Sequence, residues 1–329
     1  AWWSSCHALV LSDVSAQSTH ILDGMRLSVL DRANATSTAT GTATISSTAD
    51  VLQGVLDHAR HVEALGFAGF FVAEHHGVPG IPGTQPAMLA TAVGAATSRI
   101  RVGTAGIMLP AHQPLIVAEQ ITTLEALYPG RVDAGIGSSV GFTAAVRASL
   151  RQGDAAELKA RYPEDLREML GHLTTDTPVW LLAGFRSVLL AAELGLGVIL
   201  GGPNQADAAD LYRRNFRPGR IDAPQVIHSL NVAVADTTDA ARDLLLPEAW
   251  AQAHARTTGV FEALRPVDEL PTPTEKERRR MAETLAMAVW GTPRDVEKHL
   301  RGLGDVLVTG GMSDLAGRAR SEELLAELA

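Results

Sequence analysis

Between residues 66 and 141, short apolar stretches alternate with segments of helical periodicity, and this alternation constrains the fold more than any other feature of the 329-residue chain. Three apolar segments have the length and composition of buried strands, namely 68–73, 100–108 and 131–136. The two segments between them have the spacing and boundaries of helices, 85–96 and 114–127. Polar or glycine-rich residues follow each strand, where parallel β/α proteins place their functional groups.

The same alternation continues along the rest of the chain. Further strands are expected at 26–31, 179–183, 198–200, 226–235 and 306–309. Further helices are expected at 47–65, 164–173, 187–193, 205–215, 292–302 and 313–328, with mostly helical structure over 237–289. Eight strands that alternate with helices predict an α/β protein of a single domain, a (β/α)8 TIM barrel over residues 25–329.

The first part of the chain adds three expectations. Residues 1–24 lack the basic and apolar regions of a signal peptide, so we expect an N-terminal extension ahead of a natural start at Met25. The segment 32–46 is rich in threonine and serine and is expected to be a long loop that could cover a substrate. In the helix expected at 47–65, one side is formed by Val51, Val55, His58 and Val62.

Composition argues against several classes of partner. The formal net charge is −9, and the only concentrated charge, the mixed stretch at 275–280, is expected to be a solvated face, which makes nucleic acid and anionic membranes unsuitable partners. No run of about 18 apolar residues is present, so no membrane-spanning helix is expected. Cys6 is the only cysteine, so no intramolecular disulfide can form. These features indicate a cytoplasmic protein.

The triplet Glu74-His75-His76 follows the strand at 68–73 and allows three interpretations. A metal site is disfavoured, because successive side chains of a strand point to opposite faces and converge poorly on one ion. A structural role would have these groups hydrogen-bond to one another and to the loop backbone. A catalytic role would use a histidine as acid or base near the barrel mouth, since imidazole titrates close to neutral pH.

Glycine-rich turns after two later strands could bind an anion. Gly135, Gly137 and Gly141 lie in and after the strand at 131–136, and the turn after 179–183 contains Gly184, Arg186 and Ser187. Glycine lets the backbone approach a ligand closely, and arginine suits a phosphate. The alternative is ordinary turn chemistry without a ligand.

Ser139 lies in a G-x-S-x-G sequence, as the nucleophile of a serine hydrolase would. Such an enzyme would also need a downstream histidine, for which His228 and His254 are candidates. No HGGG-type oxyanion segment is present, and so short a pattern is common by chance. We therefore do not favour a hydrolase.

From Met25 to the C-terminus, the chain resembles the bacterial-luciferase-like, flavin-dependent monooxygenases. The most specific matches are VAEHH at 72–76, TSRIRVGTAGIMLPAHQPLIVAEQ at 97–120 and LEALYPGRVDAGIG at 124–137. The resemblance implies a (β/α)8 barrel, often a homodimer, with FMN bound at the C-terminal mouth. It implies that a separate flavin reductase supplies the FMN in reduced form, and that O2 is the co-substrate for oxygenation of a small organic molecule.

The resemblance also implies roles for particular residues. His75 takes the catalytic role of the first histidine of EHH in luciferases, and Glu74 lies beside the flavin. Ala105-Gly106 matches the position of a cis peptide under the flavin ring. The FMN phosphate is expected near Gly137-Ser138 and the turn after the next strand, formed by Ala183, Gly184, Phe185, Arg186 and Ser187.

This chain departs from the family pattern at the expected phosphate site. Many relatives have Gly-Arg where Gly137-Ser138 stands here, and the turn at 183–187 is about one residue shorter and carries Phe185-Arg186 in place of small polar residues. We expect Arg186 to supply the missing positive charge. The departure also leaves room for weak flavin binding, which suits an enzyme that borrows reduced flavin.

Two other functions stay open within the same resemblance. An oxidoreductase that uses the deazaflavin coenzyme F420 would transfer hydride without O2, and a non-catalytic flavin-binding protein would need no acid or base. For a monooxygenase, the abundance of arginine, alanine and glycine over lysine suggests a GC-rich bacterial source. Such a source, together with the long loop at 32–46, is compatible with oxygenation of an aromatic polyketide in antibiotic biosynthesis.

Overall fold

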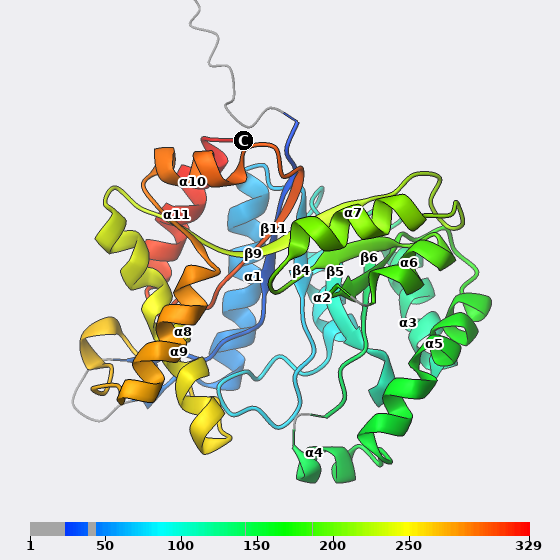
Figure 1. Ribbon diagram of the computed structural model, residues 1–329, viewed down its shortest axis with the longest axis horizontal. Coiled ribbons are helices and arrows are strands. Elements are labelled where there is room, and N and C mark those ends of the chain that lie inside the picture. The colour runs from blue at the N-terminus through cyan, green and yellow to red at the C-terminus, as the bar shows by residue number, and fades with distance from the viewer. Residues whose placement is uncertain (1–23, 39–43, 142, 186) are drawn as a thin grey trace, which may run out of the picture.

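The computed structural model describes residues 24–38, 44–141, 143–185 and 187–329, and these residues form a closed parallel barrel surrounded by helices (Figure 1). The barrel strands are β1 (Leu27–Asp31), β4 (Gly69–Val72), β5 (Arg101–Met108), β6 (Val132–Gly137), β7 (Val179–Ala183), β8 (Gly197–Leu200), β9 (Val226–Val234) and β11 (Asp305–Thr309). They are ordered β9-β11-β1-β4-β5-β6-β7-β8, and pairing of β8 with β9 closes the ring. The predicted (β/α)8 barrel is confirmed.

Helices connect consecutive barrel strands and pack on the outside. They are α1 (Thr48–Ala64), α2 (Pro86–Ala96), α3 (Pro114–Leu127), α5 (Ala155–His172), α6 (Val188–Leu194), α7 (Gln205–Asn215), α8 (Thr238–Thr258), α9 (Glu275–Ala286), α10 (Pro293–Leu300) and α11 (Leu315–Ala326). Their starts follow local chemistry: the Ser47 hydroxyl accepts from the Asp50 amide, and Pro114 occupies the first turn of α3. None of the described helices combines the length and apolarity needed to cross a lipid bilayer.

The structure adds elements that the sequence pattern did not predict. The segment 32–46, expected to be irregular, contains a short antiparallel pair formed by β2 (Ser37–Thr38) and β3 (Thr44–Ile45). The strand β10 (Val289–Gly291) pairs with the end of β9 outside the barrel ring. A short helix α4 (Ala144–Ser149) follows β6, and two single 3-10 turns occur at Leu109–Ala111 and Val267–Glu269. Residues 1–23 of the expected extension lie outside the described residues.

The barrel interior is a packed core below its C-terminal mouth. One layer of inward-facing side chains fills it, formed by Leu30, Phe71, Ala105, Trp180, Leu182, Ile199, Ile227 and Leu307. At the N-terminal end, Asp133 accepts from Trp180 Nε1 at 2.9 Å and pairs with Arg101 at 2.6 Å. A filled interior leaves the loops after the strands, on the side of α4 in Figure 1, as the place for a functional site.

Candidate active site

The carboxylate of Glu74 lies at the barrel mouth just after β4 and is held by three donors. Its side chain is fully buried, with 0% exposed. Oε2 accepts from the backbone amide of Met108 at 2.7 Å, and Oε1 accepts from His76 Nε2 at 2.6 Å and from His112 Nε2 at 2.8 Å. These three donors come from the ends of β4 and β5 and from the turn after β5, so the carboxylate joins two neighbouring strand ends.

The electrostatics around Glu74 keep it ionised. Burial alone would raise the pKa of this carboxyl, but the hydrogen bonds from His112, Met108 and His76 outweigh it and hold the pKa below its ordinary value. The second histidine of the EHH triplet is therefore the one that binds Glu74. A fixed negative charge results, close to where the resemblance expects the flavin.

His75 is not a partner of Glu74 and differs from His76 in its chemistry. Its Nδ1 is buried and has no hydrogen-bond partner among the described residues. Burial, assisted by the positive charge of Arg32 and only partly offset by Glu74, lowers the pKa of His75 to about 4. The imidazole is therefore neutral at pH 7, with a ring nitrogen left to exchange a hydrogen bond or a proton with a ligand.

An ion pair crosses the mouth beside His75. Arg32, directly after β1, pairs with Glu248, which is 2% exposed on α8. The same carboxylate accepts from the backbone amide of Gly311 after β11 and from Gln252 Nε2. The pair ties β1, β11 and α8 together above the barrel, and its positive partner helps keep His75 neutral.

The loops that form the rim of the mouth are joined through their backbones. Ala35 donates to the carbonyl of Gly80 at 2.9 Å, Leu264 donates to the carbonyl of Ala35 at 2.8 Å, and Gly80 donates to Phe261 at 3.0 Å. A Cβ at Gly80 would lie only 2.3 Å from the carbonyl oxygen of Glu262, so this contact needs glycine. The loops after β1, β4 and α8 thereby form one continuous wall on this side of the mouth.

Small residues form the floor of the mouth on β5 and β6. The peptide bond between Ala105 and Gly106 is cis, as the resemblance predicted. The pairing of β5 with β6 shifts register between Ala105 and Ile107. Cβ atoms at Gly106 and Gly135 would lie 2.8 Å and 2.0 Å from backbone oxygens of the neighbouring strand, so both positions require glycine.

The residues predicted to bind the FMN phosphate lie at the ends of two adjacent strands. Gly137 ends β6 with Ser138 directly after it, and Ala183 ends the neighbouring strand β7. In the following turn the Gly184 amide donates to Ser187 Oγ at 3.0 Å, and the side chain of Phe185 is 49% exposed. Arg186 lies outside the described residues, so its proposed contact with phosphate stays a prediction.

The described residues do not form either of the two other sites considered from the sequence, that of a serine hydrolase and that of a metal ion. Ser139 is exposed, while His228 pairs with Gln205 at 2.9 Å and His254 with Glu277 at 2.9 Å, so neither histidine serves Ser139. In the part of the chain that the structure describes, no group of three or more potential ligands is arranged to hold a metal ion.

Sequence reasoning missed three residues of the mouth: Arg32, His112 and Glu248. His112 follows a predicted strand within the LPAH sequence, so its place at a strand end was a usable signal. Arg32 follows the first predicted strand in the same way. Glu248 had no such signal, because it lies in the middle of a long helical segment.

Comparisons with known proteins agree with this geometry. A family model described as luciferase-like monooxygenase matches residues 25–310. The uncharacterized protein YvbT of Bacillus subtilis is 31% identical over 317 residues, covering 85% of this chain and 91% of YvbT. A luciferase-like monooxygenase of Escherichia coli K12 is 29% identical over 309 residues, with 85% and 91% covered. The crystal structure of apo-MsnO8 superposes with a TM-score of 0.78 at 28% identity, covering 92% of this chain and 98% of that one.

Two more distant structures share the fold with different cofactors. The oxygenating constituent of 3,6-diketocamphane monooxygenase from Pseudomonas putida, in complex with FMN, has a TM-score of 0.63 at 16% identity, with 92% of this chain and 97% of that chain covered. An F420-dependent secondary alcohol dehydrogenase has a TM-score of 0.63 at 14% identity, with 93% and 99% covered. At these identities the likeness concerns the fold alone.

Proposed function

This chain belongs to the luciferase-like monooxygenase family, and on that premise we propose that it uses reduced FMN and O2 to oxygenate a small organic molecule. In this proposal a separate flavin reductase supplies the reduced FMN. The proposal is carried by two neighbouring side chains after β4. Glu74 is ionised and held by three hydrogen bonds, whereas His75 is neutral and its Nδ1 has no hydrogen-bond partner among the described residues.

The residues at the mouth fit a flat, phosphorylated cofactor. Gly106 and Gly135 contribute no side chain to the floor of the mouth, and the side chain of Leu182 packs beside them. A Cβ at Gly184 would meet no atom of the described residues within 4 Å, so among these residues nothing fills the space beside this glycine in the turn after β7. When bound, reduced flavin would supply the electrons for the reaction with O2, in which one oxygen atom enters the product and the other is reduced to water.

The chain's own residues have three tasks in this proposal. His75 Nδ1 accepts or donates a proton at the reacting groups, which a neutral imidazole can do at pH 7. Glu74 supplies a fixed negative charge whose position is set by Met108 and two histidines. The Arg32–Glu248 pair and the joined rim loops exclude water on one side of the mouth.

The proposal also includes the class of substrate, the oligomeric state and the cellular location. An aromatic polyketide remains our candidate substrate, on the grounds of composition given above. A homodimer is proposed from the resemblance, and a cytoplasmic location from the single cysteine and the composition given above. Light scattering of the purified protein tests the dimer, and products formed from candidate polyketides test the substrate.

The cofactor can be tested before the substrate is known. We would titrate the protein anaerobically with reduced FMN and with reduced F420, then add O2 and follow return of the oxidised flavin absorbance. The expected result is binding of reduced FMN and a reoxidation rate that differs from that of free flavin. His75→Ala should keep FMN binding and lose the effect on the rate, whereas His172→Ala on the exposed end of α5 should behave like the parent protein.

Each other outcome points to one of the remaining functions. Binding of F420 without FMN would replace the proposal with F420-dependent hydride transfer. Binding of FMN with the reoxidation rate of free flavin would indicate a flavin-binding protein without catalysis. An altered rate that persists in His75→Ala would instead remove the catalytic role of His75.

A further inference from the structure

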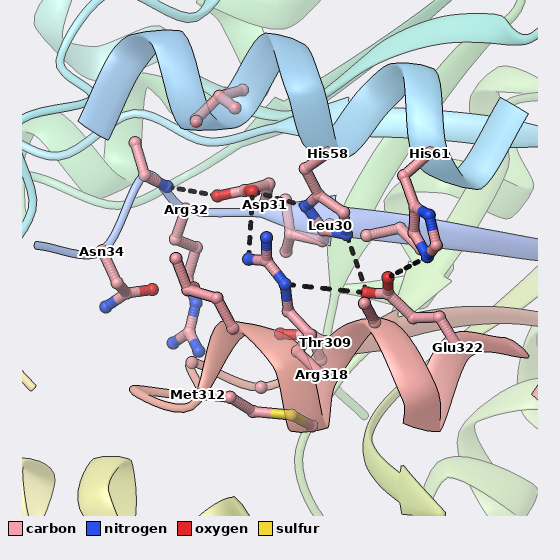
Figure 2. Close-up of a pocket in the computed structure, with 18 of the residues that line it drawn as sticks. Leu30, Asp31, Arg32, Asn34, His58, His61, Thr309, Met312, Arg318 and Glu322 are labelled. Carbon is pink, nitrogen blue, oxygen red and sulfur yellow. Dashed lines mark hydrogen bonds and ion pairs between the residues drawn. The ribbon is translucent and has the colours of Figure 1, made fainter. Parts of the chain in front are cut away.

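A cavity of about 420 Å³ lies outside the barrel, between α1, α11 and the outer faces of β1 and β11 (Figure 2). Among its lining residues, Val29 and Asp31 come from β1, and Val308 from β11. Glu74, His75, His76 and His112 are not among them. The cavity therefore lies beside the candidate active site and not within it, and Arg32 and Gly311 border both.

Four charged side chains form one wall of this cavity and balance one another. His58 Nδ1 lies 2.6 Å from Asp31 Oδ2, and Nε2 lies 2.7 Å from Glu322 Oε1. The guanidinium of Arg318 is 3.7 Å from Asp31 and 3.9 Å from Glu322, as Figure 2 shows. The hydrogen bonds that His58 donates to both carboxylates raise its pKa in spite of burial and of the nearby Arg318 charge, which favours the protonated imidazole, and this cation together with Arg318 balances the two carboxylates.

Besides Arg32 Nη2, which forms an ion pair with Glu248, four buried polar atoms around the same cavity lack a hydrogen bond within the described part of the chain. They are Asn34 Nδ2, His61 Nε2, Arg318 Nε and Glu322 Oε2. Two contacts among these atoms come close to pairing. His61 Nε2 lies 3.6 Å from Glu322 Oε2 and Arg318 Nε lies 3.9 Å from Glu322 Oε1, and both distances are too long for hydrogen bonds. Folded proteins pair nearly all such atoms, because each unpaired one costs about 1–3 kcal/mol.

The unpaired atoms define the chemistry of a ligand. Arg318 Nε and Asn34 Nδ2 are donors, whereas Glu322 Oε2 is an acceptor. A hydroxyl group can accept from a guanidinium and donate to a carboxylate at the same time. A carboxylate ligand would satisfy the donors, but it would bring an uncompensated negative charge beside Asp31 and Glu322.

We propose that this cavity binds a small neutral cyclic polyol, such as a sugar or cyclitol. One hydroxyl group accepts from Arg318 Nε and donates to Glu322 Oε2, and a second accepts from Asn34 Nδ2. The C–H faces of the ring pack on the apolar lining, which includes Val55 and Met312. The volume falls within the range of about 300–1,000 Å³ that is usual for small-molecule sites.

Gly54 offers a way to fill the cavity without disturbing the polar wall. It lines the cavity from α1, and a Cβ built there meets no atom within 4 Å. Glycine is also a poor helix residue, so Gly54→Leu is expected to fold at least as well as the parent protein. Gly171→Leu is a matched control, because Gly171 lies within α5, far along the chain from the cavity, and its Cβ position is open in the same way.

The test is a titration of the full-length protein with glucose and with glucuronate, which adds one carboxylate to the same ring. We expect glucose to bind in the millimolar range or tighter and glucuronate at least tenfold more weakly, by calorimetry or ligand-observed NMR. Gly54→Leu should weaken glucose binding at least tenfold, while Gly171→Leu should leave it unchanged. Asn34→Ala should weaken it about fivefold through loss of one hydrogen bond.

Three results would overturn the proposal. Absence of binding by both sugars would leave water as the occupant of the cavity. Equal or tighter binding of glucuronate would show that the class of ligand is wrong. Unchanged glucose binding in Gly54→Leu would place the sugar elsewhere. Arg32 borders both sites, but Glu74 and His75 do not line the cavity and glucose binding is measured without flavin, so these results do not depend on whether the protein proves to be a monooxygenase.

Discussion

Replacing His58 by leucine should destabilise the protein more than any other single change in the wall between α1 and α11. The imidazole is 3% exposed, and both of its ring nitrogens bind carboxylates. Leucine would leave Asp31 and Glu322 buried, without their shared hydrogen-bond donor. Arg318 is a poor replacement, because its guanidinium lies 3.7 Å and 3.9 Å from the two carboxylates.

The expected cost is about 3–5 kcal/mol, the range for removing one partner of a buried ion pair. That is a large part of the about 5–15 kcal/mol that stabilises a typical protein. With an unfolding entropy of about 2.1 cal/mol/K per residue over about 300 residues, the midpoint of thermal unfolding should fall by about 5–8 °C.

The same cluster should shape how stability depends on pH. Burial would raise the pKa of Asp31, but the hydrogen bond from His58 and nearby positive charge lower it well below its usual range, so its contribution is lost as pH falls below about 4. The pKa of His58 is raised, so its contribution is complete below about pH 6.5 and is lost as pH rises through the folded-state pKa. Both contributions are present between these limits.

Urea denaturation of the parent and of His58→Leu at about pH 5.5 and about pH 9 measures these effects. The difference between the two proteins should be larger at the lower pH. Glu322→Leu added to His58→Leu should recover part of the loss, because it removes one uncompensated charge. His61→Leu is the control, since His61 is 32% exposed and too far from Glu322 for a hydrogen bond. A loss below about 1 kcal/mol for His58→Leu, or an equal loss for His61→Leu, would refute the reasoning.

Three further predictions concern the barrel mouth. Glu74→Gln should lower the free energy of unfolding by about 2 kcal/mol, because an amide cannot accept from His76, His112 and Met108 as well as a carboxylate does, and urea denaturation would measure the loss. Any activity that needs neutral His75 should stay constant from about pH 7 down to about pH 5 and fall only as the pKa of about 4 is approached; a fall centred near pH 6.5 in a pH–rate profile would contradict this. Gly135→Ala should cost at least about 2 kcal/mol in a thermal melt, because its Cβ would lie 2.0 Å from a backbone oxygen of β5, whereas Gly137→Ala, with 3.7 Å to the nearest atom, should cost far less.

Most of the barrel could be predicted from sequence because its strands are buried on both faces. Each of the eight predicted strands lies within one or two residues of its position in the structure, including the continuously apolar β5. The predictions failed where the local signal was weak or misleading. The helix α5 begins at Ala155 and runs through Pro163, whereas the sequence pattern suggested a start after that proline. Strand β10 has only three residues and comes directly after α9, so its start was assigned to the helical segment expected over 237–289.

The site could be predicted as a location but not as a set of contacts. Glu74 and His75 lie where a strand end and a familiar motif placed them. His112, the partner of Glu74 from the turn after β5, lies 38 positions further along the chain, and nothing local links the two. His58 is the clearest case: in sequence it shares a helix side with three valines, and only its contact with Glu322, 264 positions away, shows that this side carries charge.

The order of strands in the barrel has a consequence for how the chain is made. The last barrel strand, β11, lies between β9 and β1, so the first strand keeps an open edge until β11 arrives. Arg26 and Asp305, which pair across that seam, are 279 positions apart. At about 5–20 residues per second a ribosome needs about 15–60 s to make that length. Closing so long a loop costs about 5 kcal/mol of chain entropy. During translation, β1 therefore stays an unpaired sheet edge that molecular chaperones can bind, and the barrel can close only after the C-terminal strand has left the exit tunnel.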